Sequence, residues 1–209
     1  AIADWTGGEI SCQVAVSILE DELGYEIDRI VFASGTGLWE AIAAGDIDFA
    51  CESWPSYAEA DEVMLNGDLI HGGEVKMTYS GDGSVKLLGT VGITGMSDYY
   101  VPKYWADAHP DFSGFADLNK YKSDFATMES GDKGRLIGCP VAGWNCHDQK
   151  RLDLLGLDFV ADELGTETAA LAEAQGMYDR GEPFLMYLWE PHWFLSLIHI
   201  SEPTRQKPI

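Results

Sequence analysis

The first 53 residues alternate between strand-like and helix-like patterns, and this alternation constrains the fold more than any other feature of the chain. Residues 9–23 form a helical pattern that Gly24 ends, as glycine commonly does. The apolar face of this helix consists of Ile10, Val14, Ile18 and Leu19. The strand patterns are 2–4, 25–33 and 46–53, with a short helical pattern at 38–44. Such alternation predicts βαβ units with parallel strands.

A second series of alternating segments occupies the later part of the chain. Its strand patterns are 85–94, 135–139, 157–163 and 183–189, and its helical patterns are 102–106, 147–155 and 166–180. We expect the first of these strands to lead into a second lobe. The sequence therefore predicts an α/β fold of two lobes, residues 1–92 and 93–194, with mostly parallel sheets flanked by helices.

The last residues differ in character from the rest of the chain. The segment "LSLIHISEPTR", 195–205, reads like the translation of a common sequencing adapter, a transposase mosaic end followed by its primer tail; a genuine C-terminal tail is the alternative. We therefore expect residues 195–209 to be an artefact and leave them out of the fold prediction. The chain also begins in mid-pattern, at "AIADWTGG". We expect the fold to be incomplete at both ends.

The charge of the chain excludes one class of partner. The formal net charge is −22 at pH 7, with 13 Lys and Arg against 35 Asp and Glu. Such a chain lacks the basic surface that neutralises phosphates, so we expect no nucleic-acid partner. The sequence also contains no phosphate-cradling glycine-rich loop, no nucleophile elbow and no paired-histidine metal motif. We expect no cofactor and no metal.

The chain has four cysteines: Cys12, Cys51, Cys139 and Cys146. An even count permits two disulfides, which would place the protein outside the cytosol. A zinc site that uses Cys139, Cys146 and His147 is the alternative. These residues lack the short C-x-x-C spacing that is typical of zinc ligands, so we favour disulfides.

Tryptophans follow several of the predicted strands at their carboxyl ends. They are Trp5, Trp54, Trp144 and Trp189. Ligands of parallel sheets bind beyond the carboxyl ends of the strands. A single tryptophan in this position would be unremarkable, since tryptophans also pack in cores. Several of them in equivalent places, from both lobes, predict a shared aromatic ligand site.

An aromatic site of this kind suits a quaternary ammonium group, which has no N–H donors and is attracted to the negative faces of tryptophan rings. Each contact contributes up to ~2 kcal/mol. Three faces then contribute roughly 6 kcal/mol, whereas micromolar affinity requires about 8 kcal/mol. We expect the backbone N–H groups of Asn145 and Cys146 to supply the remainder by binding a ligand carboxylate. A Cys139–Cys146 disulfide would fix this loop and Trp144, contributing about 2–3 kcal/mol.

Five segments together resemble the substrate-binding proteins of ABC importers for glycine betaine, proline betaine and choline. They are "DWTGGEISCQVAVSILEDELGYE", "GDIDFACESWPS", "YYVPKYW", "GCPVAGWNC" and "GEPFLMYLWEPHW". The resemblance covers almost all of residues 1–194. It implies a two-lobed type II periplasmic-binding-protein fold that closes on its ligand without catalysing a reaction. It also implies a periplasmic or other extracytoplasmic location and an ABC permease in the membrane as partner.

The resemblance also implies roles for individual residues. Trp54, Trp144 and Trp189 would form the box around a quaternary-ammonium osmolyte, and the backbone of Asn145 and Cys146 would hold its carboxylate. The first lobe would be completed by chain that follows the "WEPHW" block.

The chain departs from the family pattern at two positions. Choline-binding members carry an acid two residues after the first tryptophan, where this chain has Gly7. This difference favours a zwitterionic betaine over choline. Some betaine binders have a histidine shortly after the position of Trp54, and here Tyr57 would take its place.

Two further residue sets belong to the first lobe. Trp5 is expected either to form a fourth wall of the box or to pack within the lobe. Cys12 and Cys51 both lie near strand ends, and we expect them to pair.

Two other functions remain open at this point. A carbohydrate-active enzyme would use tryptophan platforms with Glu52 and Glu190 as its carboxylate pair. A structural, disulfide-bonded secreted domain would instead bury the tryptophans in separate cores. Glu190 and His192 suggest acid–base chemistry in "WEPHW", but we favour hydrogen bonds at a hinge near the cleft as their role.

Overall fold

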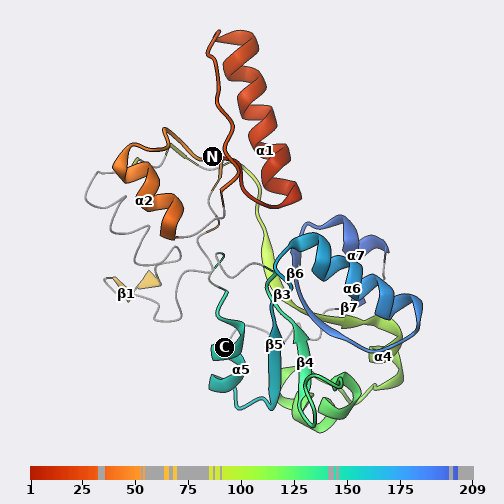
Figure 1. Ribbon diagram of the computed structural model, residues 1–209. Helices are drawn as coiled ribbons and strands as arrows, with labels where there is room; N and C mark the ends of the chain where they lie inside the picture. The colour runs from red at the N-terminus through yellow and green to blue at the C-terminus, as the bar shows by residue number, and fades with distance from the viewer. Residues whose placement is uncertain are drawn as a thin grey trace. The chain divides into compact units, whose positions relative to one another are not determined.

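The structure is a computed structural model of the 209-residue chain. It describes residues 1–32, 36–52, 54, 64–65, 68–69, 85–86, 88–89, 91–140, 144, 146–197 and 200–201. The chain divides into two compact units, and the elements of each can be followed in Figure 1. Unit 1 comprises Ala1–Ile93 and Gly143–Cys146, and unit 2 comprises Thr94–Ala142 and His147–Ile209. Residues 143–146, which include Trp144, thus belong to unit 1, whereas the residues before and after them belong to unit 2.

Unit 2 is built on a five-stranded sheet with the strand order β5-β4-β6-β3-β7. The strands are β3 (Met96–Pro102), β4 (Gly134–Ile137), β5 (Phe159–Asp162), β6 (Leu185–Glu190) and β7 (Ile200–Ser201). Strand β4 is parallel to β5 and β6, whereas β3 is antiparallel to both β6 and β7. The parallel part corresponds to the strands predicted at 135–139, 157–163 and 183–189, which are confirmed.

The helices of unit 2 are α4 (Lys103–Ala108), the 3-10 helix η3 (Phe115–Phe125), α5 (Asp148–Leu154), α6 (Glu167–Asp179) and α7 (Trp193–Leu197). The helices predicted at 102–106, 147–155 and 166–180 are therefore confirmed as α4, α5 and α6. Helix α6 begins where its sequence indicates, because the Thr166 hydroxyl oxygen accepts the N–H of Ala169 at 3.1 Å.

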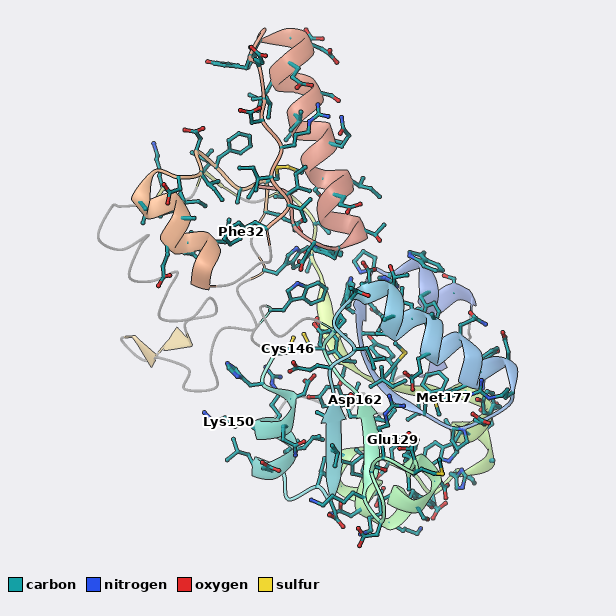
Figure 2. All side chains as sticks on the ribbon, in the orientation of Figure 1. Phe32, Glu129, Cys146, Lys150, Asp162 and Met177 are labelled. Carbon is teal, nitrogen blue, oxygen red and sulfur yellow. A yellow bond between two sulfur atoms is a disulfide. The ribbon has the colours of Figure 1, made fainter. Side chains whose placement is uncertain are left out.

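The core of unit 2 lies between α6 and the central strands. Its buried members are Tyr100, Ile137, Ala170, Leu171, Ala174, Phe184, Met186, Leu188 and Phe194. Strand β6 is buried almost throughout, as expected for a central strand that is covered on both faces. On β5, Asp162 (labelled in Figure 2) accepts a hydrogen bond from Arg135 of the neighbouring β4 at 2.7 Å. The sheet is therefore held by packing and by a cross-strand ion pair.

The residues that the structure describes in unit 1 form fewer regular elements. Helix α1 (Thr6–Ser17) continues into the π-helical turn η1 (Ile18–Glu22), and α2 (Thr36–Ala44) follows later. The two-residue strands β1 (Met64–Leu65) and β2 (Asp68–Leu69) pair antiparallel. Near the N-terminus, Ile2 forms a single parallel bridge with Val31.

Three strand predictions in the first part of the chain are wrong. The described residues of 25–33 and 46–53 contribute only the bridge at Val31, and the strand predicted at 85–94 begins instead at Met96. Parallel strands need cover on both faces. In the described residues, Ile30, Val31 and Val91 remain exposed, so this cover is lacking.

Helix α1 turns a different face inward from the one its apolar pattern predicts. Ile10, Val14 and Ile18 are 62%, 58% and 53% exposed. The buried residues are Gly8, Cys12 and Val16, which lie on the opposite side because two residues along a helix correspond to about 200°. The inward face is set by long-range contacts: Cys12 is disulfide-bonded to Cys51, 39 residues away, with their Cα atoms 5.1 Å apart.

Candidate ligand site of tryptophans and carboxylates

Trp5 and Trp54 are brought together in unit 1 around the carboxylate of Glu52. Their rings are in edge contact, with centroids 6.1 Å apart and planes inclined at 76°. The indole N–H of Trp5 donates to Oε1 of Glu52 at 2.7 Å. The residues are 47 positions apart, so this contact is a product of the fold and not of the local sequence.

Two glycines make room for this arrangement. A Cβ atom at Gly7 would lie 2.3 Å from the six-membered ring of Trp5. At Gly8, a Cβ atom would lie 2.6 Å from the Glu52 carboxylate, from the Trp5 indole nitrogen and from Ala3. A side chain at either position would displace the indole or the carboxylate. An acidic side chain at position 7 would therefore collide with the Trp5 ring in this arrangement.

Glu52 is partly withdrawn from water. Burial raises the pKa of its carboxyl above the ordinary value of 4.5, and the hydrogen bond from Trp5 opposes part of that effect. A nearby cation would favour the ionised form and lower this pKa. The carboxylate therefore lies where a positively charged ligand group would be stabilised.

Trp144 also belongs to unit 1, and its indole is held in the same manner. Its N–H donates to Oδ1 of Asp4 at 2.8 Å, across 140 residues of sequence. Asp4 immediately precedes Trp5. Two carboxylates thus connect Trp144, Trp5 and the vicinity of Trp54 into one continuous group.

The loop that carries Trp144 is fixed at its base in unit 2. There the buried carboxylate of Asp148, at the start of α5, accepts two hydrogen bonds. The Tyr99 hydroxyl donates to Oδ1 and the backbone N–H of Cys139 donates to Oδ2, each at 2.6 Å. Asp148 therefore ties β3 and the end of β4 to α5 at the point where this loop begins.

All four cysteines are oxidised. Besides the Cys12–Cys51 bond, Cys139 and Cys146 are disulfide-bonded, and there is no free cysteine. Their sulfurs are therefore unavailable to a zinc ion, which removes the zinc alternative raised by the sequence. Cys146, labelled in Figure 2, is buried.

Trp189 lies in unit 2, near the end of β6, and is supported by aromatic neighbours. Its ring centroid is 4.8 Å from His192 and 5.8 Å from Tyr187. His192 is itself fixed at both nitrogens: Nδ1 accepts the N–H of Phe194 at 3.2 Å, and Nε2 lies 3.0 Å from the Glu167 carboxylate. Since Nδ1 accepts, Nε2 carries the proton that is donated to Glu167. This buried pair has a positioning role next to Trp189.

The structure thus distributes the sequence-predicted residues unevenly. Trp5, Trp54, Trp144 and Cys146 belong to unit 1, and Trp189 belongs to unit 2. Asn145 and Tyr57 lie outside the described residues. Sequence reasoning missed Asp4, Asp148 and Glu167 as supporting groups. The position of Asp4 directly before Trp5, and of Asp148 just after the cysteine loop, were signals that could have found two of them.

Comparison with solved structures defines the fold. The chain has the fold of type II periplasmic binding proteins. The glycine/betaine/L-proline-binding protein ProX of Borrelia burgdorferi is similar with a TM-score of 0.66 and 20% identity, over 96% of this chain and 67% of that one. Lactococcal OpuAC, in its closed form with glycine betaine, matches with a TM-score of 0.64 and 15% identity over 96% and 67%. A choline-binding protein of an ABC transporter, in complex with choline, gives 0.62 and 18% over 96% and 62%.

The family follows from the sequence comparison. The chain belongs to the family described as the substrate-binding domain of ABC-type glycine betaine transport systems, whose model matches residues 1–201. The glycine betaine/proline betaine-binding periplasmic protein of Escherichia coli (strain K12) is 25% identical over 184 residues, which are 85% of this chain and 50% of that protein. The chain therefore spans about half the length of this curated relative.

The comparisons also decide between the function classes left open by the sequence. The family and its structural relatives are substrate-binding proteins and not enzymes. The alternative of a carbohydrate-active enzyme with a Glu52/Glu190 pair is therefore wrong. In the part of the chain that the structure describes, no helix has both the length and the apolar character required to cross a membrane.

Proposed function

We propose that this chain is the ligand-binding part of an extracytoplasmic receptor that delivers a quaternary-ammonium osmolyte, of the glycine betaine type, to an ABC importer. Membership of the glycine betaine substrate-binding family supports this assignment. The single observation that carries it is the group formed by Trp5, Trp54 and Trp144 with two carboxylates. Such a group provides both the aromatic faces and the negative potential that a trimethylammonium group requires.

In this proposal Trp54, Trp144 and Trp189 contact the trimethylammonium group, and Trp5 forms a further wall. The backbone N–H groups of Asn145 and Cys146 bind the ligand carboxylate, and Tyr57 supplies an additional polar contact. The absence of an acid at position 7 favours a zwitterionic betaine over choline. The protein acts in the periplasm or an equivalent extracytoplasmic space. Ligand binding selects a closed state of the two lobes, which the permease recognises.

Calorimetric titration of the purified protein tests this function. Glycine betaine, proline betaine and choline are compared with a panel of sugars. Each single replacement by alanine, of Trp54, Trp144 or Trp189, should weaken betaine binding at least tenfold. A desolvated cation–π contact contributes up to ~2 kcal/mol, and about 1.4 kcal/mol corresponds to a factor of ten in affinity.

Trp39→Ala is the matched control, because Trp39 lies on α2, outside the proposed box. Its substitution should leave the betaine affinity unchanged. Near-native affinity in all three box variants would contradict the aromatic box, even if the wild-type protein binds betaine. Absence of any response to quaternary amines in the wild-type protein would contradict the function itself.

A further inference from the structure

The indole N–H groups of Trp5 and Trp144 both donate to carboxylates, although an uncharged acceptor would satisfy each of them. An indole N–H needs only one acceptor, and a backbone carbonyl or a hydroxyl would serve at lower cost than a charged group withdrawn from water. In this chain the acceptors are Glu52, at 2.7 Å, and Asp4, at 2.8 Å. Both lie within unit 1, in the same group of residues.

Neither carboxylate is paired with a cation among the described residues. In the described residues, no Lys, Arg or His forms an ion pair with Asp4 or Glu52. The indole N–H is a neutral donor, so each hydrogen bond satisfies an oxygen without neutralising the carboxylate. When ionised, each carboxylate therefore places negative charge at the edge of an indole ring with no cation beside it. Negative charge beside a ring strengthens the attraction of that ring for a cation.

We propose that Asp4 and Glu52 are specificity-determining residues, which orient the indoles of Trp144 and Trp5 and make the site select ligands by positive charge as well as by shape. This inference rests on the proposed function, because it assigns the two carboxylates to the same ligand site. The inference goes beyond the proposed function, because an aromatic box alone also accommodates an uncharged group of the same size.

The surroundings of Glu52 show that its position is built into the fold. Gly8 allows the carboxylate and the Trp5 nitrogen to approach the start of α1, and Gly7 allows the Trp5 ring to lie over the backbone. Position 7 has no acidic side chain, but the carboxylate of Glu52 lies beside the Trp5 indole. Burial raises the pKa of Glu52, and a bound cation would offset this cost by stabilising the ionised carboxylate.

The test compares ligands that differ only in charge. Glycine betaine is paired with 3,3-dimethylbutanoate, and choline with 3,3-dimethylbutan-1-ol, so that a tert-butyl group replaces trimethylammonium in each pair. The variants are Asp4→Asn and Glu52→Gln, whose amide oxygens still accept the indole N–H. The control is Glu22→Gln, an equal change of charge at an exposed position of unit 1. Affinities are measured by calorimetry.

The ratio of affinities within each pair is the decisive quantity. We expect this preference for the ammonium ligand to fall roughly fivefold or more in Asp4→Asn and in Glu52→Gln, and to be unchanged in Glu22→Gln. Equal losses for the charged and uncharged ligands would assign the carboxylates a purely structural role and overturn the proposal. Unchanged ratios in both variants would overturn it as well.

Two further measurements separate this inference from the proposed function. The indole N–H resonances of Trp5 and Trp144 in the ligand-free protein should shift in Glu52→Gln and Asp4→Asn respectively, which tests the hydrogen bonds without any ligand. In the wild-type protein, betaine affinity should decline as the pH falls and Glu52 becomes protonated, and Glu52→Gln should reduce this decline. A protein that binds betaine with an unaltered charge preference in the variants would retain its function and refute the inference.

Discussion

The two units of this protein are stabilised in different ways. Unit 2 combines a sheet with a continuous apolar core under α6. In the described part of unit 1, strand pairing is limited to the short antiparallel pair β1–β2 and the bridge between Ile2 and Val31, and large apolar side chains such as Ile10 and Val14 face solvent. Its order depends on a disulfide and on hydrogen bonds between residues distant in sequence.

In the described part of unit 1, the residues of the proposed ligand site have little regular secondary structure around them. In unit 1 the tryptophans are oriented through their polar edges, by Asp4 and Glu52. In unit 2, Trp189 lies at the end of a buried strand and is supported by packing and by His192. The first arrangement should respond to charge and pH, and the second to changes in core volume.

The largest expected effect is in the core of unit 2. Phe184 is fully buried there, and Phe184→Ala should lower the free energy of unfolding of this unit by about 4 kcal/mol, because it removes apolar contacts and leaves a cavity. Denaturant unfolding and amide hydrogen exchange of β6 and α6 measure the loss. Met128→Ala, at a residue that is 95% exposed, is the control and should change stability by less than about 0.5 kcal/mol. Equal effects of the two changes would contradict the core described for unit 2.

The next effect concerns the disulfide of unit 1. Removal of the Cys12–Cys51 bond by the double change Cys12→Ser and Cys51→Ser frees a loop with a sequence separation of 39. We expect a loss of about 3–4 kcal/mol and faster amide exchange in α1, with β4 and β6 of unit 2 unaffected. The variant is preferable to a reducing agent, which would also attack Cys139 and Cys146. Undiminished protection of α1 would show that unit 1 has a sufficient core of its own.

The sequence predicted most of unit 2 because its signals are local. Helix α6 has its cap at Thr166, and β6 is a continuous apolar run. The antiparallel direction of β3 could not be predicted, since direction is set by the partner strand and not by the strand itself. The helix face of α1 was predicted wrongly because the buried stripe of Gly8, Cys12 and Val16 is less apolar than the exposed stripe that begins at Ile10 and Val14, and the disulfide of Cys12 decides between them.

The candidate site shows the same limit. The tryptophans were found because several of them follow predicted strands, which is a repeated and readable signal. The pairing of each indole with its carboxylate was not predicted, because the Trp5–Glu52 and Trp144–Asp4 contacts span 47 and 140 residues. Asp4 precedes Trp5 and Glu52 lies two residues before Trp54, but nothing local identifies the indole that each carboxylate binds.

A smaller effect should appear in the pH dependence of unit 1. Burial raises the pKa of Glu52 in the folded state, so the folded protein retains this proton at pH values where the unfolded chain has lost it. The resulting stabilisation is complete below the unfolded value near 4.5 and is lost as the pH rises through the folded pKa. Glu52→Gln should remove this fall in stability between pH 4 and 7. Unfolding curves over that pH range measure the change in stability, with Glu22→Gln as control. A steeper fall in the stability of Glu52→Gln than of the wild type would contradict a raised pKa of Glu52 in the folded state.

The smallest effect tests the exposed face of α1. Ile10→Ala should change the stability by less than about 0.5 kcal/mol, because the side chain is mostly in water and alanine is the better helix former. Val16→Ala, on the buried face of the same helix, should cost more, about 1–2 kcal/mol, because methyl groups are removed from a packed site. Both are measured by denaturant unfolding with hydrogen exchange of α1 as the local readout. A cost at Ile10 equal to that at Val16 would mean that both faces of α1 are covered in solution, and the contrast between the two units would then disappear.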